Sequence, residues 1–196
     1  MSYGTENSDL RVQRTCKAIN TAFEELICET EAHSISASKI AQRAQINRKT
    51  FYRHYDGVEN LFDTAVQAIC DGFTNTLNQQ GDPDTPQDIN RKFFAYFTIQ
   101  EPYVERILCE PSYNVYREKI VETTAVAIRH ALGFSTYLAK DDEEIMNSFI
   151  VRNMFDMYTH WVTLGKKITP IRLAWLSSQH LYDDKQFVNL VTGDHS

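Results

Sequence analysis

The sequence predicts an all-α protein. Apolar residues recur at intervals of three and four along most of the chain, as they do on the buried face of a helix. Seven glycines and five prolines are too few for a β protein with many tight turns. With 196 residues, of which 42% are hydrophobic and 23% charged, the chain is typical of a globular protein of one or two small domains.

The composition also limits the cellular compartment in which we expect the protein and the kinds of metal or cofactor site that it can hold. No apolar run is long enough to span a bilayer, and the first ten residues lack the features of a signal peptide. We therefore expect a cytoplasmic protein with no membrane partner. The four cysteines lie far apart without a CxxC spacing, which favours buried free thiols in a reducing compartment. We predict neither a metal site nor another cofactor.

The net charge of −6 is unevenly distributed. Residues 1–55 hold eight Lys and Arg against six Asp and Glu, whereas residues 56–196 hold twelve against twenty. A basic patch on an acidic body can still bind DNA, because phosphate attraction is local and screened within about 10 Å. Residues 32–55 contain five cations and no acid: Lys39, Arg43, Arg48, Lys49 and Arg53.

A first helix is predicted from Arg11 to about Thr30, after a flexible terminus at residues 1–10. Its cations lie near the start and its acids near the end, an order that the helix dipole disfavours. A phosphate backbone near Arg11, Arg14 and Lys17 would explain this order, and so would a solvated charged face. Both interpretations stay open at this point.

Two short helices follow, with an abrupt turn between them. Ser36 is a suitable N-cap for the first of them, and Asn47 for the second. Phe51 and Tyr55 are four residues apart on the second helix, so they share a face that we assign inward. The opposite face carries only cationic and aromatic polar side chains: Arg48, Lys49, Tyr52, Arg53 and His54.

A long helix over residues 56–78 connects this head to a larger helical body. Segment 79–88 combines glycine, prolines and acids, so we predict a boundary there between domains at 11–78 and 79–196. The middle of one body helix is apolar on nearly every side, which favours a homodimer through the last two helices. Body helices are predicted over about 89–100, 102–109, 113–132, 141–164 and from 170 onward.

Two short helices joined by a tight turn are typical of a helix-turn-helix, whose second helix enters the DNA major groove. Arg48 and Lys49 can donate to guanine, while Thr50 and Tyr52 can donate to phosphate. We predict that the following residues contact double-stranded DNA: Ser36, Lys39, Asn47, Arg48, Lys49, Thr50, Tyr52, Arg53 and His54.

A longer pattern lies in register over about residues 11–77: Ser36, Ile40-Ala41, Ala44, Ile46, Asn47, Thr50-Phe51-Tyr52, Tyr55 and Glu59-x-Leu61. With this pattern the head resembles the DNA-binding domain of the TetR family of bacterial transcriptional regulators. Two positions depart from the family. Gln45 stands where Gly is usual, so it must adopt a conformation that Gly reaches more easily. Val58 stands where many members have a phosphate-binding Lys.

The resemblance implies a homodimeric regulator, most often a repressor, that binds a near-palindromic operator. It also implies a body with an effector-binding cavity, so that a small-molecule effector shifts the long helix 56–78 and releases the operator. We select nine candidate pocket residues from the body: Phe94, Phe97, Tyr103, Asn153, Phe155, Asp156, Tyr158, His160 and Trp161.

Each of these candidates has an alternative interpretation. For any one of the aromatic residues, packing in the core is favoured over contact with a ligand. Asn153, Asp156 and His160 form a polar stripe on an apolar helix, and their partners are a ligand, a twin chain or a core network with Arg152.

Two other classes of protein compete with a regulator of this kind. One is a helix-turn-helix protein that acts mainly through a protein partner. The other is a small helical enzyme, which we rank last. The sequence lacks the HExxH, GxSxG and glycine-rich phosphate-loop motifs, so we nominate no catalytic residue.

Overall fold

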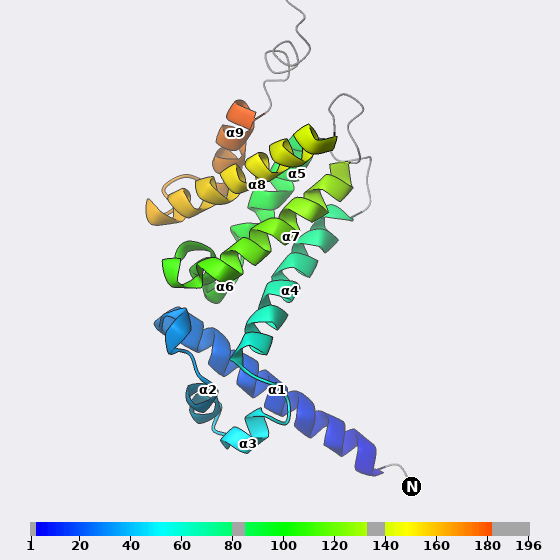
Figure 1. Cartoon of the computed structure of the whole chain (residues 1–196), viewed down its shortest axis with the longest axis vertical. Coiled ribbons are helices and arrows are strands. Elements are labelled where there is room, and N and C mark those ends of the chain that lie inside the picture. The colour runs from blue at the N-terminus through cyan, green and yellow to red at the C-terminus, as the bar shows by residue number, and fades with distance from the viewer. Residues whose placement is uncertain (1–2, 80–84, 133–139, 182–196) are drawn as a thin grey trace, which may run out of the picture. The chain divides into compact units, whose positions relative to one another are not determined.

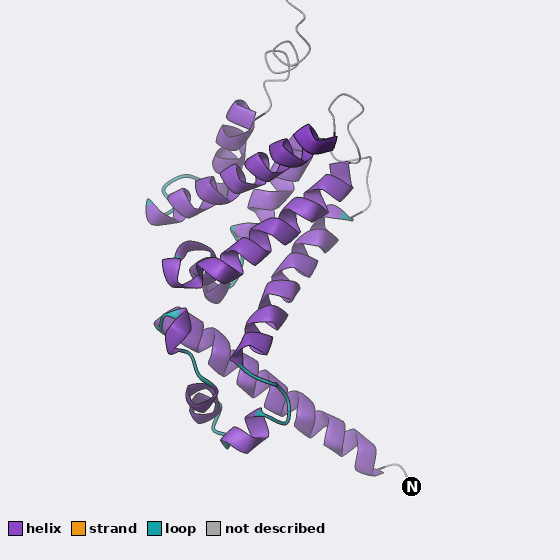
Figure 2. Ribbon diagram, in the orientation of Figure 1, coloured by secondary structure: helices purple, strands orange, loops and turns teal. Residues whose placement is uncertain are grey.

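The computed structural model describes residues 3–79, 85–132 and 140–181, and these residues form helices without any strand (Figures 1 and 2). The prediction of an all-α fold is confirmed. The α-helices are α1 (Tyr3–Glu29), α2 (Ala37–Arg43), α3 (Arg48–Phe51), α4 (Val58–Leu77), α5 (Pro86–Phe97), α6 (Pro102–Cys109), α7 (Asn114–Leu132), α8 (Lys140–Thr163) and α9 (Pro170–Leu181). Two short 3-10 helices are η1 (Ala32–Ser34) and η2 (Pro111–Tyr113).

The chain forms two compact units, which we call the first unit and the second unit. The first unit comprises residues 1–69 and 101–117, and the second comprises 70–100 and 118–196. The first unit is therefore discontinuous in sequence, because α6, η2 and the start of α7 pack with the head. Residues 80–84 of the predicted boundary lie outside the described residues.

The core of the first unit follows the apolar stripes of α1 and α4. Ile19, Phe23 and Ile27 of α1 are buried, and the ring of Phe23 meets that of Phe62 at a centroid distance of 4.7 Å. The helix α1 begins at Tyr3, so the predicted start at Arg11 after a flexible terminus was too late.

Tyrosines at the end of η2 and in α7 join α6 and α7 to the head. Tyr113 is fully buried and donates its hydroxyl to the carbonyl oxygens of Thr30 at 2.8 Å and Ile27 at 3.3 Å. The ring of Tyr116 stacks on Phe62 at 3.9 Å, and its hydroxyl donates to the carboxylate of Glu59 at 2.9 Å. These contacts cover the end of α1 and the start of α4.

In the second unit, rings from α4, α5 and α8 form an aromatic cluster of Phe73, Phe93, Phe97 and Phe155. The centroid of Phe97 lies 5.5 Å from that of Phe73, 4.7 Å from that of Phe93 and 5.0 Å from that of Phe155. All four rings are fully buried. This cluster is the centre of the second unit's core.

A buried polar network joins α5 to α9 in the same unit. Asn90 donates its side-chain amide to the carbonyl oxygen of Ala174 at 2.7 Å. Ser177 donates its hydroxyl to the amide oxygen of Asn90 at 2.8 Å. Since both polar side chains are buried and hydrogen-bonded, these bonds offset the cost of desolvation and fix α9 against α5.

Turn residues set most of the helix ends. Gly165 has a φ of +77°, which fits the end of α8, and Pro170 begins α9 as predicted. α7 ends at Leu132, which is the end predicted for this helix. α3 ends at Phe51, four residues before the predicted end at Tyr55, and turns follow it.

Candidate nucleic-acid interface

The turn between α2 and α3 has the geometry of a helix-turn-helix. Gln45 has a φ of +55°, in the left-handed region, so the strained conformation predicted for this position is confirmed. The backbone N–H of Ile46 then donates to the carbonyl oxygen of Ala41 at 2.9 Å. This bond closes the end of α2 and redirects the chain into α3.

Both predicted N-caps are present. Ser36 accepts a hydrogen bond from the backbone N–H of Lys39 at 3.3 Å. The amide oxygen of Asn47 accepts from the backbone N–H of Thr50 at 2.8 Å and from its hydroxyl at 3.1 Å. These side chains therefore hold the ends of α2 and α3, and the hydroxyl of Thr50 is already engaged within the chain.

Four exposed side chains of α3 and the following turn form the surface that we call the reading face: Arg48, Lys49, Tyr52 and Arg53. The guanidinium carbon of Arg48 lies 5.4 Å from the centroid of the Tyr52 ring, and its Nη2 donates to the Tyr52 hydroxyl at 3.2 Å. These contacts order Arg48 before any ligand arrives. Lys49 and Arg53 make no ion pair with another described residue.

His54, also predicted to contact DNA, is partly exposed and lies apart from the four residues of the reading face. Its Nδ1 lies 3.5 Å from Cys16 Sγ on α1. Because α3 ends at Phe51, the chain turns and carries His54 toward the head core instead of outward. Tyr55 is inward as predicted, and its hydroxyl donates to the amide oxygen of Asn20 at 2.8 Å.

The remaining cations of residues 32–55 are engaged by the chain. Arg43 donates to Glu25 at 3.1 Å and to Glu29 at 2.6 Å, so α2 is clamped to the acidic end of α1. The hydrogen bond from Arg43 holds the pKa of Glu29 below its usual range. Lys39 donates its ammonium to the carbonyl oxygen of Ser34 at 2.8 Å.

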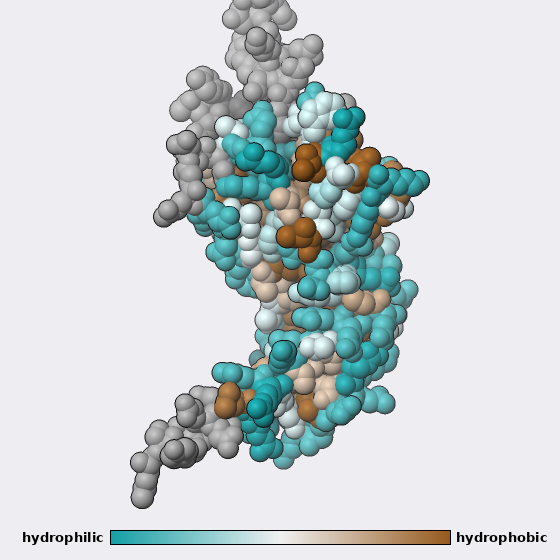
Figure 3. Space-filling model, turned by 180° about the vertical axis from the view of Figure 1, so that it is seen from behind, coloured by the Kyte–Doolittle hydropathy of each residue, from teal (hydrophilic) through white to brown (hydrophobic). Residues whose placement is uncertain are grey.

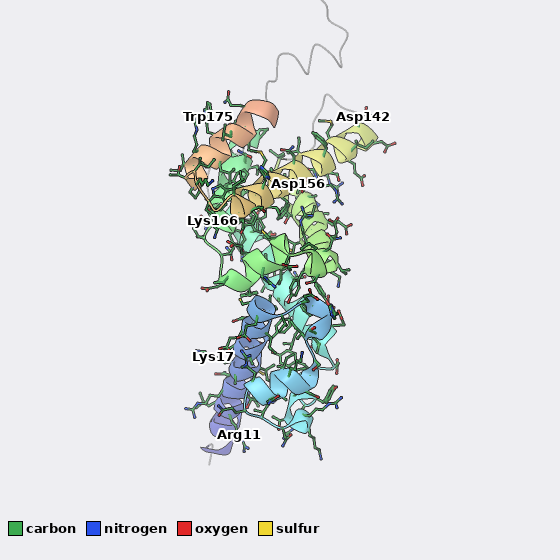
Figure 4. The ribbon with its side chains drawn as sticks, turned by 90° about the vertical axis from the view of Figure 1, so that its left-hand side faces the viewer. Arg11, Lys17, Asp142, Asp156, Lys166 and Trp175 are labelled. Carbon is green, nitrogen blue, oxygen red and sulfur yellow. The ribbon has the colours of Figure 1, made fainter. Side chains whose placement is uncertain are left out.

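Three cations near the middle of α1, which begins at Tyr3, are solvent-exposed. Arg11, Arg14 and Lys17 are all exposed, and Figure 4 shows Arg11 and Lys17 along this helix. The pairing of Glu25 and Glu29 with Arg43 explains why acids gather at the C-terminal end of α1.

The candidate effector residues fall in three places. The rings of Phe94, Phe97 and Phe155 are fully buried, and Tyr158 is nearly so. The Tyr158 centroid lies 6.4 Å from that of Phe97, so these rings belong to the packed core, as the alternative interpretation holds. Tyr103 belongs to the first unit, whereas the other candidates belong to the second, and burial raises its pKa.

The polar stripe of α8 lines a surface groove of about 420 Å³ between α8 and α9, the α8–α9 groove. Asp156 and His160 are exposed and Asn153 is partly exposed, so the stripe does not form a buried core network. Trp161 also lines the groove, and its indole N–H donates to the carbonyl oxygen of Ile168 at 2.8 Å. The other lining residues are Met157, Leu164, Lys167, Ile168, Leu173 and Leu176.

A second cavity of about 580 Å³, the α5–α9 groove, was not predicted from the sequence. Ile171 and Trp175 of α9 are exposed on its wall, and Arg172 stacks on Trp175 with its guanidinium carbon 4.4 Å from the ring centroid. Figure 4 labels Trp175 on α9 and Asp156 on α8. The sequence carried one signal for this groove: α9 has apolar residues on the side that faces away from its buried residues.

Two other features are absent from the described residues. No helix among them is long and apolar enough to cross a bilayer. Within the same residues, no three His, Cys, Asp or Glu side chains are grouped closely enough to hold a metal ion.

The helix-turn-helix geometry of α2 and α3, together with the exposed cationic face, places this all-α fold in the class of helix-turn-helix proteins. No family model matches the chain. The uncharacterized HTH-type transcriptional regulator YxbF from Bacillus subtilis (strain 168) is 34% identical over 77 residues. That match covers 39% of this chain and 20% of YxbF, so the chain aligns with only a fifth of this relative.

Solved structures match over much more of the chain. A TetR transcriptional regulator from Streptococcus agalactiae 2603V has a TM-score of 0.65 at 19% identity, over 91% of this chain and 99% of that one. NalD, the secondary repressor of the MexAB-OprM multidrug efflux pump in Pseudomonas aeruginosa, has a TM-score of 0.68 at 17% identity, over 87% and 95%. The chain has the fold of the TetR-family transcriptional regulators, and the predicted resemblance is confirmed.

Proposed function

We propose that the chain is a TetR-like transcriptional regulator that binds double-stranded DNA through α3. The observation that carries this proposal is the reading face, where Lys49 and Arg53 are exposed and Arg48 is ordered by Tyr52. No acid of residues 32–55 opposes these cations, because that segment contains none. Such a face suits the phosphates and guanine edges of the major groove.

Binding of a labelled random-sequence duplex, measured by fluorescence anisotropy at rising salt, tests this proposal. We expect binding at low salt that weakens steeply as salt rises, because cations released from DNA drive association. Replacing Lys49 and Arg53 together by Ala should weaken binding and flatten the salt slope. Arg91→Ala on α5, whose guanidinium pairs with Asp88 in the second unit, is the matched control and should change neither.

The same measurement separates the regulator from the protein-binding alternative. A chain that acts mainly through a protein partner has no need of a salt-dependent affinity for DNA. A duplex that stays unbound at low salt would therefore overturn the regulator proposal and favour a protein partner.

We also propose that the regulator is a homodimer that pairs through α8 and α9. Both helices carry exposed large apolar side chains: Ile145 and Phe149 on α8, and Ile171 and Trp175 on α9. Exposed apolar groups gathered on two neighbouring helices favour a partner surface, whereas isolated ones need no explanation. In the view from behind in Figure 3, brown side chains stand out within a largely teal surface.

The proposed mode of action is repression that a small-molecule effector relieves. Two structural neighbours support a regulatory role of this kind by their names: NalD is a repressor, and FadR from Bacillus halodurans is a fatty acid degradation regulator. Helix α4 contributes residues to both units and is the proposed route of coupling. The α8–α9 groove, with Asn153, Asp156 and His160, is the proposed effector contact surface.

A further inference from the structure

Two stretches of the first unit contain no acidic residue, and they pack against each other. Residues 10–23 of α1 hold no Asp or Glu, and residues 32–55, which carry the reading face, hold none either. The Tyr55 hydroxyl donates to the amide oxygen of Asn20 at 2.8 Å, so the two stretches are in contact. No carboxylate of either stretch can therefore repel a phosphate there.

Three cations follow one another at intervals of three in the acid-free part of α1, and we call them the α1 stripe: Arg11, Arg14 and Lys17. This spacing places neighbouring side chains on one face of a helix. All three are exposed, and none makes an ion pair with another described residue. Like charges at this spacing destabilise a helix slightly, and a bound anion relieves that repulsion.

The other Lys and Arg side chains of the first unit, apart from those of the reading face, are engaged within the chain. Arg43 and Arg106 make ion pairs with glutamates, and Lys39 donates to a backbone carbonyl oxygen. Arg117 likewise interacts with other groups of the chain. In the part of the first unit that the structure describes, the free cations are therefore the α1 stripe and two cations of the reading face.

The α1 stripe lies beside the reading face. Cys16 Sγ lies 3.5 Å from His54 Nδ1. Lys17 and Arg53 are chain neighbours of this pair, so the stripe and the reading face meet at this contact. Figure 1 shows the N-terminal half of α1 and α3 at the same end of the first unit, and Figure 4 shows Arg11 at that end. The stripe is about 9 Å long at a rise of 1.5 Å per residue, which matches roughly two to three phosphates of one DNA strand.

We propose that the α1 stripe binds the phosphate backbone of double-stranded DNA beside the segment that α3 contacts. The inference rests on the proposed function, because it gives the same duplex a second contact surface. Guanidinium and ammonium groups donate to phosphate oxygens without reading a base, so the stripe positions the chain on the duplex and does not select the sequence. Its binding displaces counterions from the backbone, which makes the contact dependent on salt.

Fluorescence anisotropy with the labelled random-sequence duplex, at several salt concentrations, tests the α1 stripe. Replacing Arg11, Arg14 and Lys17 together by Gln keeps the exposed side chains polar and removes three charges. Each lost phosphate contact should lower the salt slope by about 0.9, so we expect a fall of roughly 2.7 per chain and binding at least about tenfold weaker at about 0.1 M salt. The conservative variant with Arg11→Lys, Arg14→Lys and Lys17→Arg should bind as the wild-type chain does.

The matched control removes the same charge from exposed or partly exposed positions of the second unit: Arg91→Gln, Lys119→Gln and Arg129→Gln together. This variant should keep the wild-type salt slope and affinity. A similar loss in both Gln variants would show that net charge acts alone, which overturns a local contact of the α1 stripe.

Enrichment of bound sequences from a random duplex library separates backbone binding from base reading. The wild-type chain and the Gln variant of the α1 stripe should enrich the same sequence, because phosphate contacts carry no sequence information. A changed sequence overturns the assignment to the backbone. If the wild-type chain binds the duplex and the stripe variant keeps its salt slope, the α1 stripe proposal fails while the proposed function stands. A wild-type chain that binds no duplex overturns both.

Discussion

At the scale of single residues, Gln45 has a backbone conformation that its Cβ atom disfavours but that the fold requires. The turn of the head requires a positive φ, and a residue with a Cβ atom holds it at a cost of about 1 to 2 kcal/mol. Gln45 tolerates this conformation because Ala41 and Ile46 close the turn around it. The strain is local and leaves the reading face exposed.

Replacing Gln45 by Gly should therefore stabilise the chain. Removing the Cβ atom relieves the left-handed strain, while the added freedom of Gly in the unfolded chain offsets about 0.5 to 1 kcal/mol of the gain. We expect a net increase of about 0.5 to 1 kcal/mol in the free energy of unfolding, measured by urea denaturation. Gln42→Gly, an exposed position inside α2, is the matched control and should lose about 1 kcal/mol. Equal losses in both variants would contradict the strain argument.

Arg48 is the residue that we expect to read a base. Its guanidinium is held by the Tyr52 ring, and a bidentate bond to guanine contributes about 1 to 3 kcal/mol to discrimination. Arg48→Ala should lose that preference, measured as enrichment of bound sequences from a random duplex library. Arg152→Ala, which removes the partner of Glu118 on the second unit, is the control and should leave the enriched sequence unchanged. An unaltered preference in Arg48→Ala would exclude base reading by this residue.

At the scale of elements, the joining of α6, η2 and α7 to the head is the main finding. Tyr113 bonds to a carbonyl 83 residues earlier in the chain, at the end of α1. Burial raises the pKa of Tyr113 to about 12 and also raises the pKa of Tyr116. The head is thus held by two phenols that must stay protonated.

Alkali should weaken this packing. Because the folded-state pKa of Tyr113 is above that of a free tyrosine, the folded chain binds more protons than the unfolded chain between pH 10 and about 12. The stabilisation is present below pH 10 and is lost as the pH rises through the folded-state value. The free energy of unfolding of Tyr113→Phe should be lower by about 1 kcal/mol at pH 7, measured by urea denaturation, and should decline less steeply above pH 10. Identical slopes in the wild-type and Tyr113→Phe chains would contradict this assignment.

The sequence patterns predicted the elements better than the contacts between them. Residues that act on near neighbours were predictable: the caps Ser36 and Asn47, and the conformation of Gln45. The direction of His54 was not, because helical spacing was extended past the point where α3 ends. The bond from Tyr113 to Thr30 was hidden as well, since periodicity within a helix does not report a partner far along the chain.

The body shows a different limit of the sequence. A buried aromatic residue has the same apolar neighbours in sequence whether it lines a cavity or fills a core. Phe94, Phe97 and Phe155 could therefore not be assigned to either before the structure placed them in contact with other rings. The polar residue Asp156 was left open in the same way, and only its exposure on α8 in the structure decides between surface and core.

At the scale of the whole molecule, the proposed dimer makes a prediction about mass. Trp175 is 48% exposed on α9, so a charge there should spare the fold but prevent an apolar pairing surface from closing. Trp175→Glu should sediment as a monomer in analytical ultracentrifugation, whereas the wild-type chain should sediment as a dimer. Val115→Glu, at an exposed apolar position on α7, is the control and should remain dimeric. A Trp175→Glu chain of unchanged mass would refute pairing through α9.

The discontinuity of the first unit limits how the head can be exchanged between proteins of this fold. A graft of residues 1–78 onto another body would leave behind residues 101–117, and with them the side chains that cover Ile27 and Phe62. The recipient would have to supply matching tyrosines or accept an uncovered apolar surface. Recombination between regulators of this fold is therefore expected to keep residues 1–69 and 101–117 from the same parent.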